Sequence, residues 1–285
     1  MITRRSVSIS LGAALGALVV RKGWAQPDPS FEEIIRRPVV YSVPGMADVR
    51  VRDGLVYKTV QDSPLHFDWY APAAAAAARP AVILIHGGPI PTLGARRSGV
   101  FVSYGRLLAA SGMIGIAFDH RLLGPDRLRD SAADVADLVR HVRDQASTLD
   151  IDPSRLALWA FSGGGPLLAA PLRERPSWLK LVVAYYAAME PLGGGQDESL
   201  SAIAALGRDA SNAPPIVLAR AGRDRFPEIN SSIDRFVAAA NSAGATVDLL
   251  THPTGRHGFD ILDPGERSNQ IIQHTIATLR QRLGA

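Results

Sequence analysis

Short continuous runs of apolar residues recur along most of the chain, separated by stretches with an apolar residue at every third or fourth position. Such runs are typical of strands buried on both faces, and the longer spacing is typical of helices packed on a sheet. The predicted strands are Ala81–Ile85, Met113–Phe118, Leu156–Phe161, Leu179–Tyr186, Ile216–Ala221 and Thr246–Leu250. The predicted helices are Val100–Ala110, Ala132–Gln145, Pro166–Arg173, Ile229–Ala240 and Ser268–Leu283.

Two earlier segments, Val49–Val60 and Leu65–Tyr70, alternate apolar and polar residues around a turn, which predicts an antiparallel pair. The predicted fold class is therefore α/β, with a mostly parallel central sheet of about eight strands flanked by helices. No repeat of fixed period and no linker rich in Pro, Gly or Ser divides the pattern. We therefore expect residues 26–285 to form one domain.

The first 25 residues have the pattern of an export signal. Arg4 and Arg5 precede a weakly apolar run over residues 7–20, and the small residues Gly23 and Ala25 flank a candidate cleavage site. The run is shorter than the roughly 20 residues of a membrane-spanning helix, and the paired arginines resemble the twin-arginine export motif. We expect residues 1–25 to engage export machinery and the mature chain to be periplasmic or secreted, with no stable membrane span. An uncleaved anchor is the alternative.

The amino-acid composition excludes several kinds of functional site. The chain is 47% apolar and 20% charged and has no cysteine, which excludes disulfides, a thiolate nucleophile and cysteine-ligated zinc. No histidine pair has the spacing of a helical metal site, so we predict no metal. The mechanism predicted below also requires no cofactor. Four of the 31 Lys and Arg residues lie in the export segment, which leaves 27 basic and 27 acidic residues in the body. A body of zero formal charge argues against nucleic-acid binding.

One serine has the sequence context of an enzyme nucleophile. Ser162 follows a predicted buried strand and precedes a helix that Pro166 can open at its first turn. A nucleophilic hydroxyl must project from a sharp, strained turn, and the small neighbours Ala160 and Gly164 make that turn possible.

Backbone amides near this serine could stabilise the negative charge that develops on a substrate oxygen. The amide of Gly163 is the first candidate, because it follows the nucleophile directly. A second amide must come from another loop. The turn His86-Gly87-Gly88-Pro89 follows another apolar strand, and we expect Gly88, or alternatively Gly87, to supply it.

A serine hydroxyl also needs a histidine to take its proton and a carboxylate to orient that histidine. Asp224 follows the predicted strand that ends at Ala221, and His257 lies in the loop after the strand that ends near Leu250. The sequence therefore predicts a catalytic triad in the chain order Ser162, Asp224, His257.

With these motifs the chain resembles the α/β-hydrolases, and within them the dienelactone-hydrolase-like and carboxylesterase-like branches. The resemblance covers most of the mature chain and rests on Ala160-Phe161-Ser162-Gly163-Gly164, on the lead-in over residues 151–156, and on the acid turn and histidine loop. Ala160 replaces the usual glycine, and the turn after His86 lacks the third glycine of the hormone-sensitive-lipase pattern. The resemblance implies the α/β-hydrolase fold and acyl transfer, and serine peptidases of this fold leave an amide substrate open.

Other acids have simpler interpretations. Asp119 is the best alternative to Asp224 as the orienting acid. Asp260 is too close to His257 in sequence to meet its outer ring nitrogen, and we expect Asp260 and Asp248 to be solvated or helix-capping.

The remaining residues concern the surroundings of the site. We expect His86 to brace the glycine turn, and Arg121 to pair with Asp126 in preference to a substrate carboxylate. The long segment over residues 187–212 could form a lid or pocket wall over Ser162. Tyr186 and Met189 could line an acyl pocket there, although core positions are the alternative.

Together these residues predict a serine hydrolase that cleaves a carboxylic ester, or a related acyl bond, of a small-molecule substrate through an acyl-enzyme. An exopeptidase or amidase on the same fold is one alternative. A non-catalytic binding protein that keeps the hydrolase shell is the other.

Overall fold

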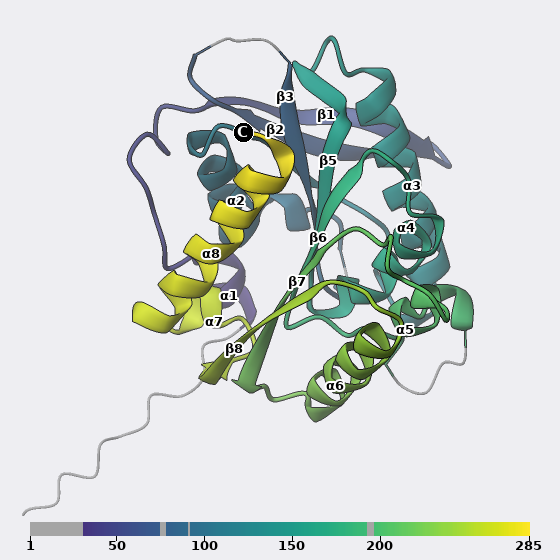
Figure 1. Ribbon diagram of the computed structural model, residues 1–285. Helices are drawn as coiled ribbons and strands as arrows, with labels where there is room; N and C mark the ends of the chain where they lie inside the picture. The colour runs from purple at the N-terminus through teal and green to yellow at the C-terminus, as the bar shows by residue number, and fades with distance from the viewer. Residues whose placement is uncertain (1–30, 75–77, 91, 193–196) are drawn as a thin grey trace, which may run out of the picture.

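The computed structural model describes residues 31–74, 78–90, 92–192 and 197–285, and one eight-stranded sheet runs through this part of the chain (Figure 1). Its strand order is β1-β2-β4-β3-β5-β6-β7-β8, and every pair after β4 is parallel, whereas β2 is antiparallel to both β1 and β4. The strands are β1 (Arg50–Val60), β2 (Ser63–Ala71), β3 (Arg79–Ile85), β4 (Ile114–Phe118), β5 (Ile151–Phe161), β6 (Leu179–Tyr185), β7 (Ile216–Arg223) and β8 (Val247–Arg256). The predicted fold class is confirmed.

Every apolar run predicted as a strand forms one, and the main differences lie at the strand ends. β8 continues to Arg256, although its apolar run ends near Leu250. β8 is the last strand of the sheet and pairs only with β7, so polar residues can stay in the strand with their side chains near solvent. As a result, Asp224 and His257 each follow directly on the end of a strand, and these strands are neighbours.

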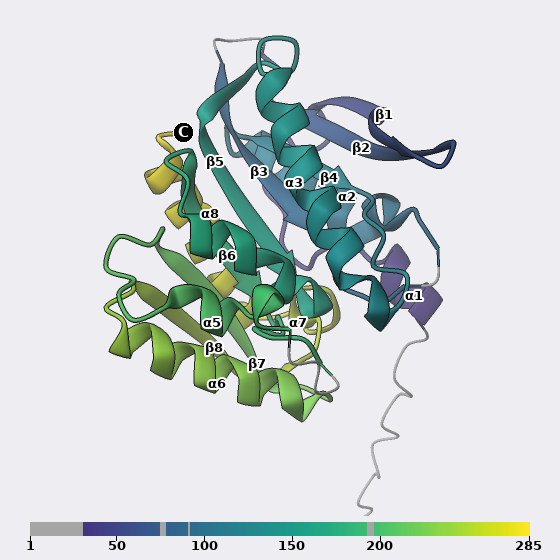
Figure 2. The ribbon, with the colours of Figure 1, turned by 90° about the vertical axis from the view of Figure 1, so that its right-hand side faces the viewer.

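Helices cover both faces of the sheet, and Figures 1 and 2 show the two layers. On one face lie α1 (Phe31–Arg36), α2 (Gly99–Ala110), α7 (Phe259–Leu262) and α8 (Glu266–Leu283). On the other lie α3 (Leu128–Asp144), α4 (Ala169–Glu174), α5 (Ala202–Leu206) and α6 (Pro227–Ser242). Short 3-10 segments are η1 (Ala95–Arg97), η2 (Pro125–Arg127), η3 (Ser162–Leu168) and η4 (Glu198–Leu200). The helix predicted to start at Pro166 is thus α-helical only from Ala169 onward.

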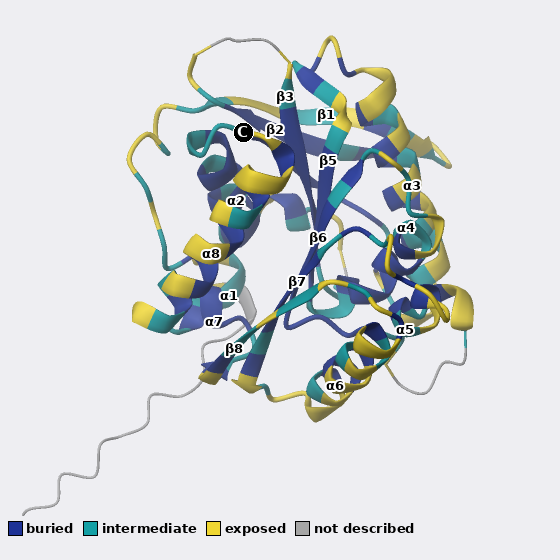
Figure 3. Ribbon diagram, viewed as in Figure 1, coloured by how far each residue is buried: buried dark blue, intermediate teal, exposed yellow. Residues whose placement is uncertain are grey.

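The core consists of two apolar clusters, one on each face of the sheet, and Figure 3 shows the central strands as the buried part of the molecule. Along β5, Trp159 and Phe161 belong to the cluster under α2 and α8, whereas Leu158 and Ala160 belong to the cluster on the other face. Packing on both sides fixes the carboxyl end of β5, where Ser162 begins the next segment. A reactive side chain there stands on a rigid support.

The segment predicted as an export signal, residues 1–25, lies outside the described residues, as does Gly193-Gly194-Gly195. Within the described ranges, no helix combines the length and apolar character that crossing a membrane requires. The first described element is α1, which lies at the same end of the molecule as α7, the end toward which β5 and β7 run in Figure 1.

Candidate active site

Ser162 stands at the junction of β5 and η3, where the chain turns sharply. Its φ of 51° lies in the left-handed region, which costs a residue with a side chain about 1–3 kcal/mol and needs support from its surroundings. The support is close backbone packing. A Cβ on Gly164 would lie 2.7 Å from the carbonyl oxygen of His86, and one on Gly163 would collide with the carbonyl oxygen of Gly88. Only glycine fits at both positions after the serine.

Ser162, His257 and Asp224 form a continuous hydrogen-bonded chain. Ser162 Oγ lies 2.8 Å from His257 Nε2, and His257 Nδ1 lies 2.8 Å from Asp224 Oδ2. In a neutral imidazole protonated at Nδ1, this nitrogen donates to the carboxylate while Nε2 accepts the hydroxyl proton of the serine. The three residues meet because β5, β7 and β8 end at the same edge of the sheet, although 95 positions separate Ser162 from His257.

The neighbours of His257 restrict its orientation and its access to water. The Asp224 side chain is fully buried, whereas that of His257 is 13% exposed. Asp224 Oδ1 also accepts a hydrogen bond from the amide of Phe226 at 2.9 Å. The rings of Tyr186 and Phe226 meet the imidazole edge to face, with centroids 4.7 and 5.1 Å away. These contacts hold the imidazole between its two hydrogen-bond partners.

The glycine turn after β3 packs directly against Ser162. A Cβ on Gly87 would lie 2.7 Å from Cβ of Ser162, and the carbonyl of Gly88 touches Gly163. The candidate amide donors therefore lie together at this turn, with Gly87 against Ser162 and Gly88 against Gly163.

His86 supports this turn from within the core. Its Nδ1 lies 2.6 Å from the carbonyl oxygen of Gly87, to which a protonated Nδ1 donates. The ring stacks on that of His120, with the centroids 3.6 Å apart. Burial lowers the pKa of both histidines, so the stacked pair is neutral and packs like two aromatic rings.

Ser162 and His257 line a cleft of about 1140 Å³. Its walls are the glycine turn, residues 92–102, the ends of β7 and β8, and the short helices α1 and α7. Much of this lining is apolar and includes Ile35, Phe101 and Ile261. A mainly apolar cleft with a few convergent polar groups is typical of small-molecule sites.

The pocket wall expected over residues 187–212 is in a different place. None of the described residues in this range, 187–192 and 197–212, lines the cleft, and α5 packs against α4 and α6 on the far face of the sheet. Met189 is fully buried in the core there, and its amide donates to Ser232. Tyr186, in contrast, lines the cleft beside His257. The sequence did not reveal the wall formed by α1 and residues 92–102, because only the tertiary fold brings them to the serine.

The expectation of a solvated or helix-capping Asp260 is wrong. Its side chain is fully buried in the first turn of α7. Oδ1 accepts a hydrogen bond from the Tyr186 hydroxyl at 2.8 Å, and Oδ2 accepts one from the Tyr104 hydroxyl at 2.7 Å. Burial raises the pKa of Asp260 to about 6, although both phenol hydrogen bonds and the nearby His257 act in the opposite direction. The two phenols that hold this carboxylate come from distant elements, which gave no sequence signal.

The alternative acids are engaged elsewhere. Asp119 Oδ2 pairs with Arg96 at 2.6 Å, and Arg96 also reaches Asp68 in the same buried group. Asp248 lies 2.5 Å from His274 at the surface. Over the described ranges, no cluster of three or more His, Asp or Glu side chains could hold a metal ion.

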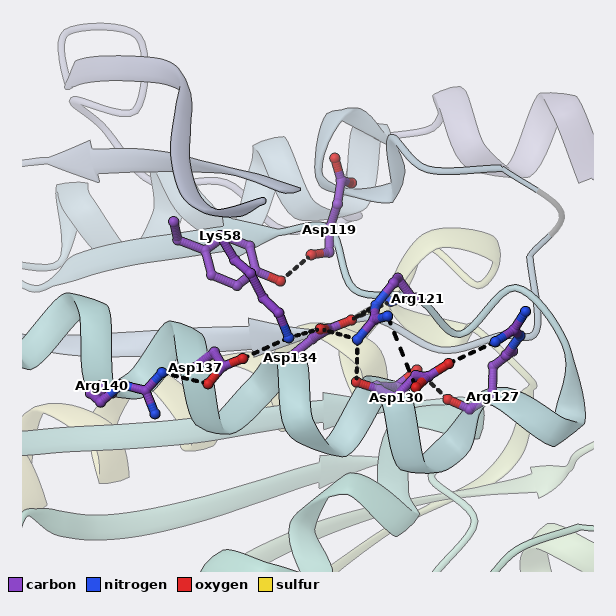
Figure 4. Close-up of polar contacts among 10 residues, drawn as sticks. Lys58, Asp119, Arg121, Arg127, Asp130, Asp134, Asp137 and Arg140 are labelled. Atoms are coloured by element: carbon purple, nitrogen blue, oxygen red, sulfur yellow. Dashed lines mark hydrogen bonds and ion pairs between the residues drawn. The ribbon is translucent and has the colours of Figure 1, made fainter. Parts of the chain in front are cut away.

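Arg121 pairs with a different acid from the one expected. Its Nε lies 2.8 Å from Asp134 Oδ2, and Lys58 binds the other oxygen of Asp134 at 2.8 Å (Figure 4). Asp126 is 79% exposed and is close to Arg127 instead. The partner was missed because the helical turns of α3 carry Asp134 back toward β1 and the end of β4, a placement that sequence distance does not show.

Comparisons with known proteins agree with this architecture. Residues 67–173, which include Ser162, match a family model described as BD-FAE. Comparison with curated proteins gives no match.

Several solved structures are similar to the chain. The esterase 2 of Thermogutta terrifontis, phosphoramylated by tabun, has a TM-score of 0.64 at 23% identity and covers 84% of this chain and 94% of its own. A truncated carbohydrate esterase from gut microbiota has a TM-score of 0.68 at 18% identity, over 88% and 100% of the two chains. Esterase B from Lactobacillus rhamnosis has a TM-score of 0.65 at 20% identity, over 84% and 89%. Likenesses at this level of identity establish a shared fold.

Proposed function

We propose that this chain, which has the α/β-hydrolase fold, is a serine hydrolase that cleaves carboxylic esters through an acyl-enzyme. The observation that carries the proposal is the unbroken hydrogen-bond chain from Ser162 Oγ through His257 to Asp224, with both distances at 2.8 Å. An ester is favoured over other acyl substrates because the similar solved structures are named esterases.

Acylation uses the hydrogen bonds that the resting site already makes. His257 Nε2 takes the proton of Ser162 as its Oγ attacks the ester carbonyl, and the buried Asp224 carboxylate stabilises the imidazolium that forms. The oxygen of the tetrahedral intermediate accepts hydrogen bonds from the amides of Gly163 and Gly88, with Gly87 as the alternative to Gly88. His257 then returns the proton to the leaving alcohol.

Deacylation repeats this sequence with water in place of the serine. His257 takes a proton from a water molecule, whose oxygen attacks the acyl carbonyl, and Ser162 regains its proton as the acid leaves. Each step needs only side chains and amides of this chain. Hydrolysis of an aryl ester should release its phenol in an initial burst if deacylation is slower than acylation.

Replacing the nucleophile tests the proposal. Ser162→Ala is expected to lower kcat on a short-chain aryl ester by roughly 10⁴-fold or more, with the fold intact by circular dichroism. A fluorophosphonate probe should label the native protein stoichiometrically and leave Ser162→Ala unlabelled. Ser177→Ala, at an exposed serine that is absent from the cleft lining, is the matched control. Activity of Ser162→Ala within tenfold of the native protein would contradict the assignment.

The same measurements separate the two alternatives. An exopeptidase or amidase would hydrolyse aminoacyl anilides faster than the aryl ester, again with Ser162 as nucleophile. A folded chain that neither reacts with the probe nor turns over any ester, anilide or lactone would be a binding protein.

We also propose that residues 1–25 direct export, on the basis of Arg4, Arg5 and the weakly apolar run that follows. Expression of the full chain with Arg4→Lys and Arg5→Lys together should move activity from the periplasmic to the cytoplasmic fraction if the twin-arginine route is used. An unchanged distribution would exclude that route.

A further inference from the structure

The mouth of the catalytic cleft carries an excess of positive charge that the triad does not use. Arg36 in α1, Arg97 in η1, and Arg223 and Arg225 on either side of Asp224 all line the cleft, and all four residues are exposed. No Asp or Glu occurs among the described residues of the lining. The buried Asp224 side chain is shielded from the cleft and is already bound to His257.

The four side chains have no ionic partner in the described part of the chain. None of Arg36, Arg97, Arg223 and Arg225 makes a side-chain hydrogen bond or ion pair there. Two other arginines show the contrast: Arg121 is held by Asp134, and Arg256, which also lines the cleft, is held by Asp263. Because the body of the chain has equal numbers of basic and acidic residues, an unbalanced group at the mouth of the cleft is a local feature of this site.

The position of Arg225 connects this charge to the reacting groups. Its guanidinium lies 4.9 Å from the ring centre of Phe226, and that ring lies 5.1 Å from the imidazole of His257. A cation over an aromatic face is attracted by it and held in a restricted position. Arg223, which directly precedes Asp224, lines the same cleft as Arg225 and His257.

We infer that the substrate is an ester that carries a negatively charged oxygen group, a carboxylate in the simplest case, at the end that faces the cleft mouth. Guanidinium groups bind carboxylates through paired N–H donors. The apolar lining accepts the hydrocarbon part of the ester, and the arginines at the mouth bind the charged end while the carbonyl lies at Ser162. This inference rests on the proposed esterase function and specifies its substrate class.

Two matched pairs of substrates test the inference. p-Nitrophenyl monoglutarate and p-nitrophenyl valerate place a charged or a neutral end on the acyl side, and 4-acetoxybenzoate and 4-acetoxybenzamide do so on the alcohol side. We expect kcat/KM for the charged member to exceed that of its neutral partner by about tenfold in at least one pair, with Ser162→Ala as the blank. The preference should decrease when ionic strength rises from about 0.01 M to about 0.5 M, because salt screens exposed charges.

Arginine variants then locate the effect. Arg36→Gln with Arg97→Gln, and separately Arg223→Gln with Arg225→Gln, should each lower the ratio of kcat/KM between charged and neutral partners several-fold, mainly through KM. Arg282→Gln, at an exposed arginine of α8 outside the cleft lining, is the control and should leave the ratio unchanged. The Arg36 and Arg97 pair keeps the test valid if changes beside Asp224 disturb the triad.

The possible outcomes are distinct. Hydrolysis of the neutral esters with no preference for either charged partner would overturn the inference and leave the esterase function standing. No hydrolysis of any of the four substrates, together with no fluorophosphonate labelling, would overturn the proposed function itself. A preference that both double variants retain would show that these arginines do not bind the charged group.

Discussion

Two fully buried carboxylates, Asp224 and Asp260, lie close to His257, and they differ in their hydrogen-bond partners. Asp224 binds His257 Nδ1 directly, so a proton on the imidazole gives it an opposite charge at 2.8 Å. Asp260 instead binds the neutral hydroxyl groups of Tyr104 and Tyr186. Tyr186 connects the two regions, because its hydroxyl binds Asp260 and its ring packs on the imidazole.

The difference predicts separate roles for the two side chains. A carboxylate next to a group that becomes cationic during reaction stabilises that cation. A carboxylate among neutral donors loses hydration without gaining an opposite charge, and its pKa therefore rises, for Asp260 to about 6. We therefore expect Asp224 to affect chiefly catalysis and Asp260 chiefly the pH dependence of stability.

The largest expected effect is a loss of catalytic activity when Asp224, but not Asp260, is replaced by asparagine. Asp224→Asn should lower kcat on an aryl ester by roughly 10⁴-fold, because an amide at this position favours the wrong imidazole tautomer and cannot stabilise the imidazolium. Initial rates at saturating substrate measure the effect. Asp248→Asn, which changes a half-exposed surface acid, should keep the native rate. Comparable losses of kcat for Asp224→Asn and Asp260→Asn would remove the distinction drawn between them.

The next effect concerns stability. Because the folded pKa of Asp260 is raised from 3.8 to about 6, the folded state binds its proton more tightly than the unfolded state. The stability associated with this proton is fully present below about pH 4 and is lost as the pH rises through the folded pKa. A shift of this size corresponds to about 3 kcal/mol.

Urea unfolding of the native protein and of Asp260→Asn at several pH values measures this term. The unfolding free energy of the native protein relative to the variant should fall by about 2.5 kcal/mol between about pH 4 and about pH 7.5, and any constant cost of the substitution cancels in the comparison. Asp126→Asn, at a side chain that is 79% exposed, should show no such trend. A flat difference for Asp260→Asn would mean that its carboxylate stays ionised in the folded chain.

The sequence analysis predicted the position of Asp224 correctly and that of Asp260 wrongly, and the reason is physical. Asp224 follows a recognisable apolar run, so its place at the sheet edge could be predicted from local pattern. Asp260 is held by the phenol groups of Tyr104 in α2 and Tyr186 at the end of β6. The sequence around residue 260 contains no pattern that predicts these two partners. The same limit explains why Met189 was expected to line a pocket, since an apolar residue suits a pocket and a core equally well. It also explains why the cleft wall formed by α1 was not predicted. Strands, helices and strand-end motifs follow from short-range pattern, whereas partners across the sheet require the tertiary fold.

The smallest expected effect on stability comes from removing each of the two phenol hydrogen bonds to Asp260 separately. Tyr104→Phe and Tyr186→Phe each remove one donor to the carboxylate while keeping the ring. Hydrogen bonds to a charged acceptor are stronger than those to a neutral one, so each variant should be destabilised by about 1 kcal/mol more at pH 7.5 than at pH 4. Tyr185→Phe provides the control, since its hydroxyl binds Thr275 and its loss should cost the same at both pH values. If all three variants show the same pH dependence, the phenols do not hold a titrating carboxylate, and the raised pKa of Asp260 must be abandoned with them.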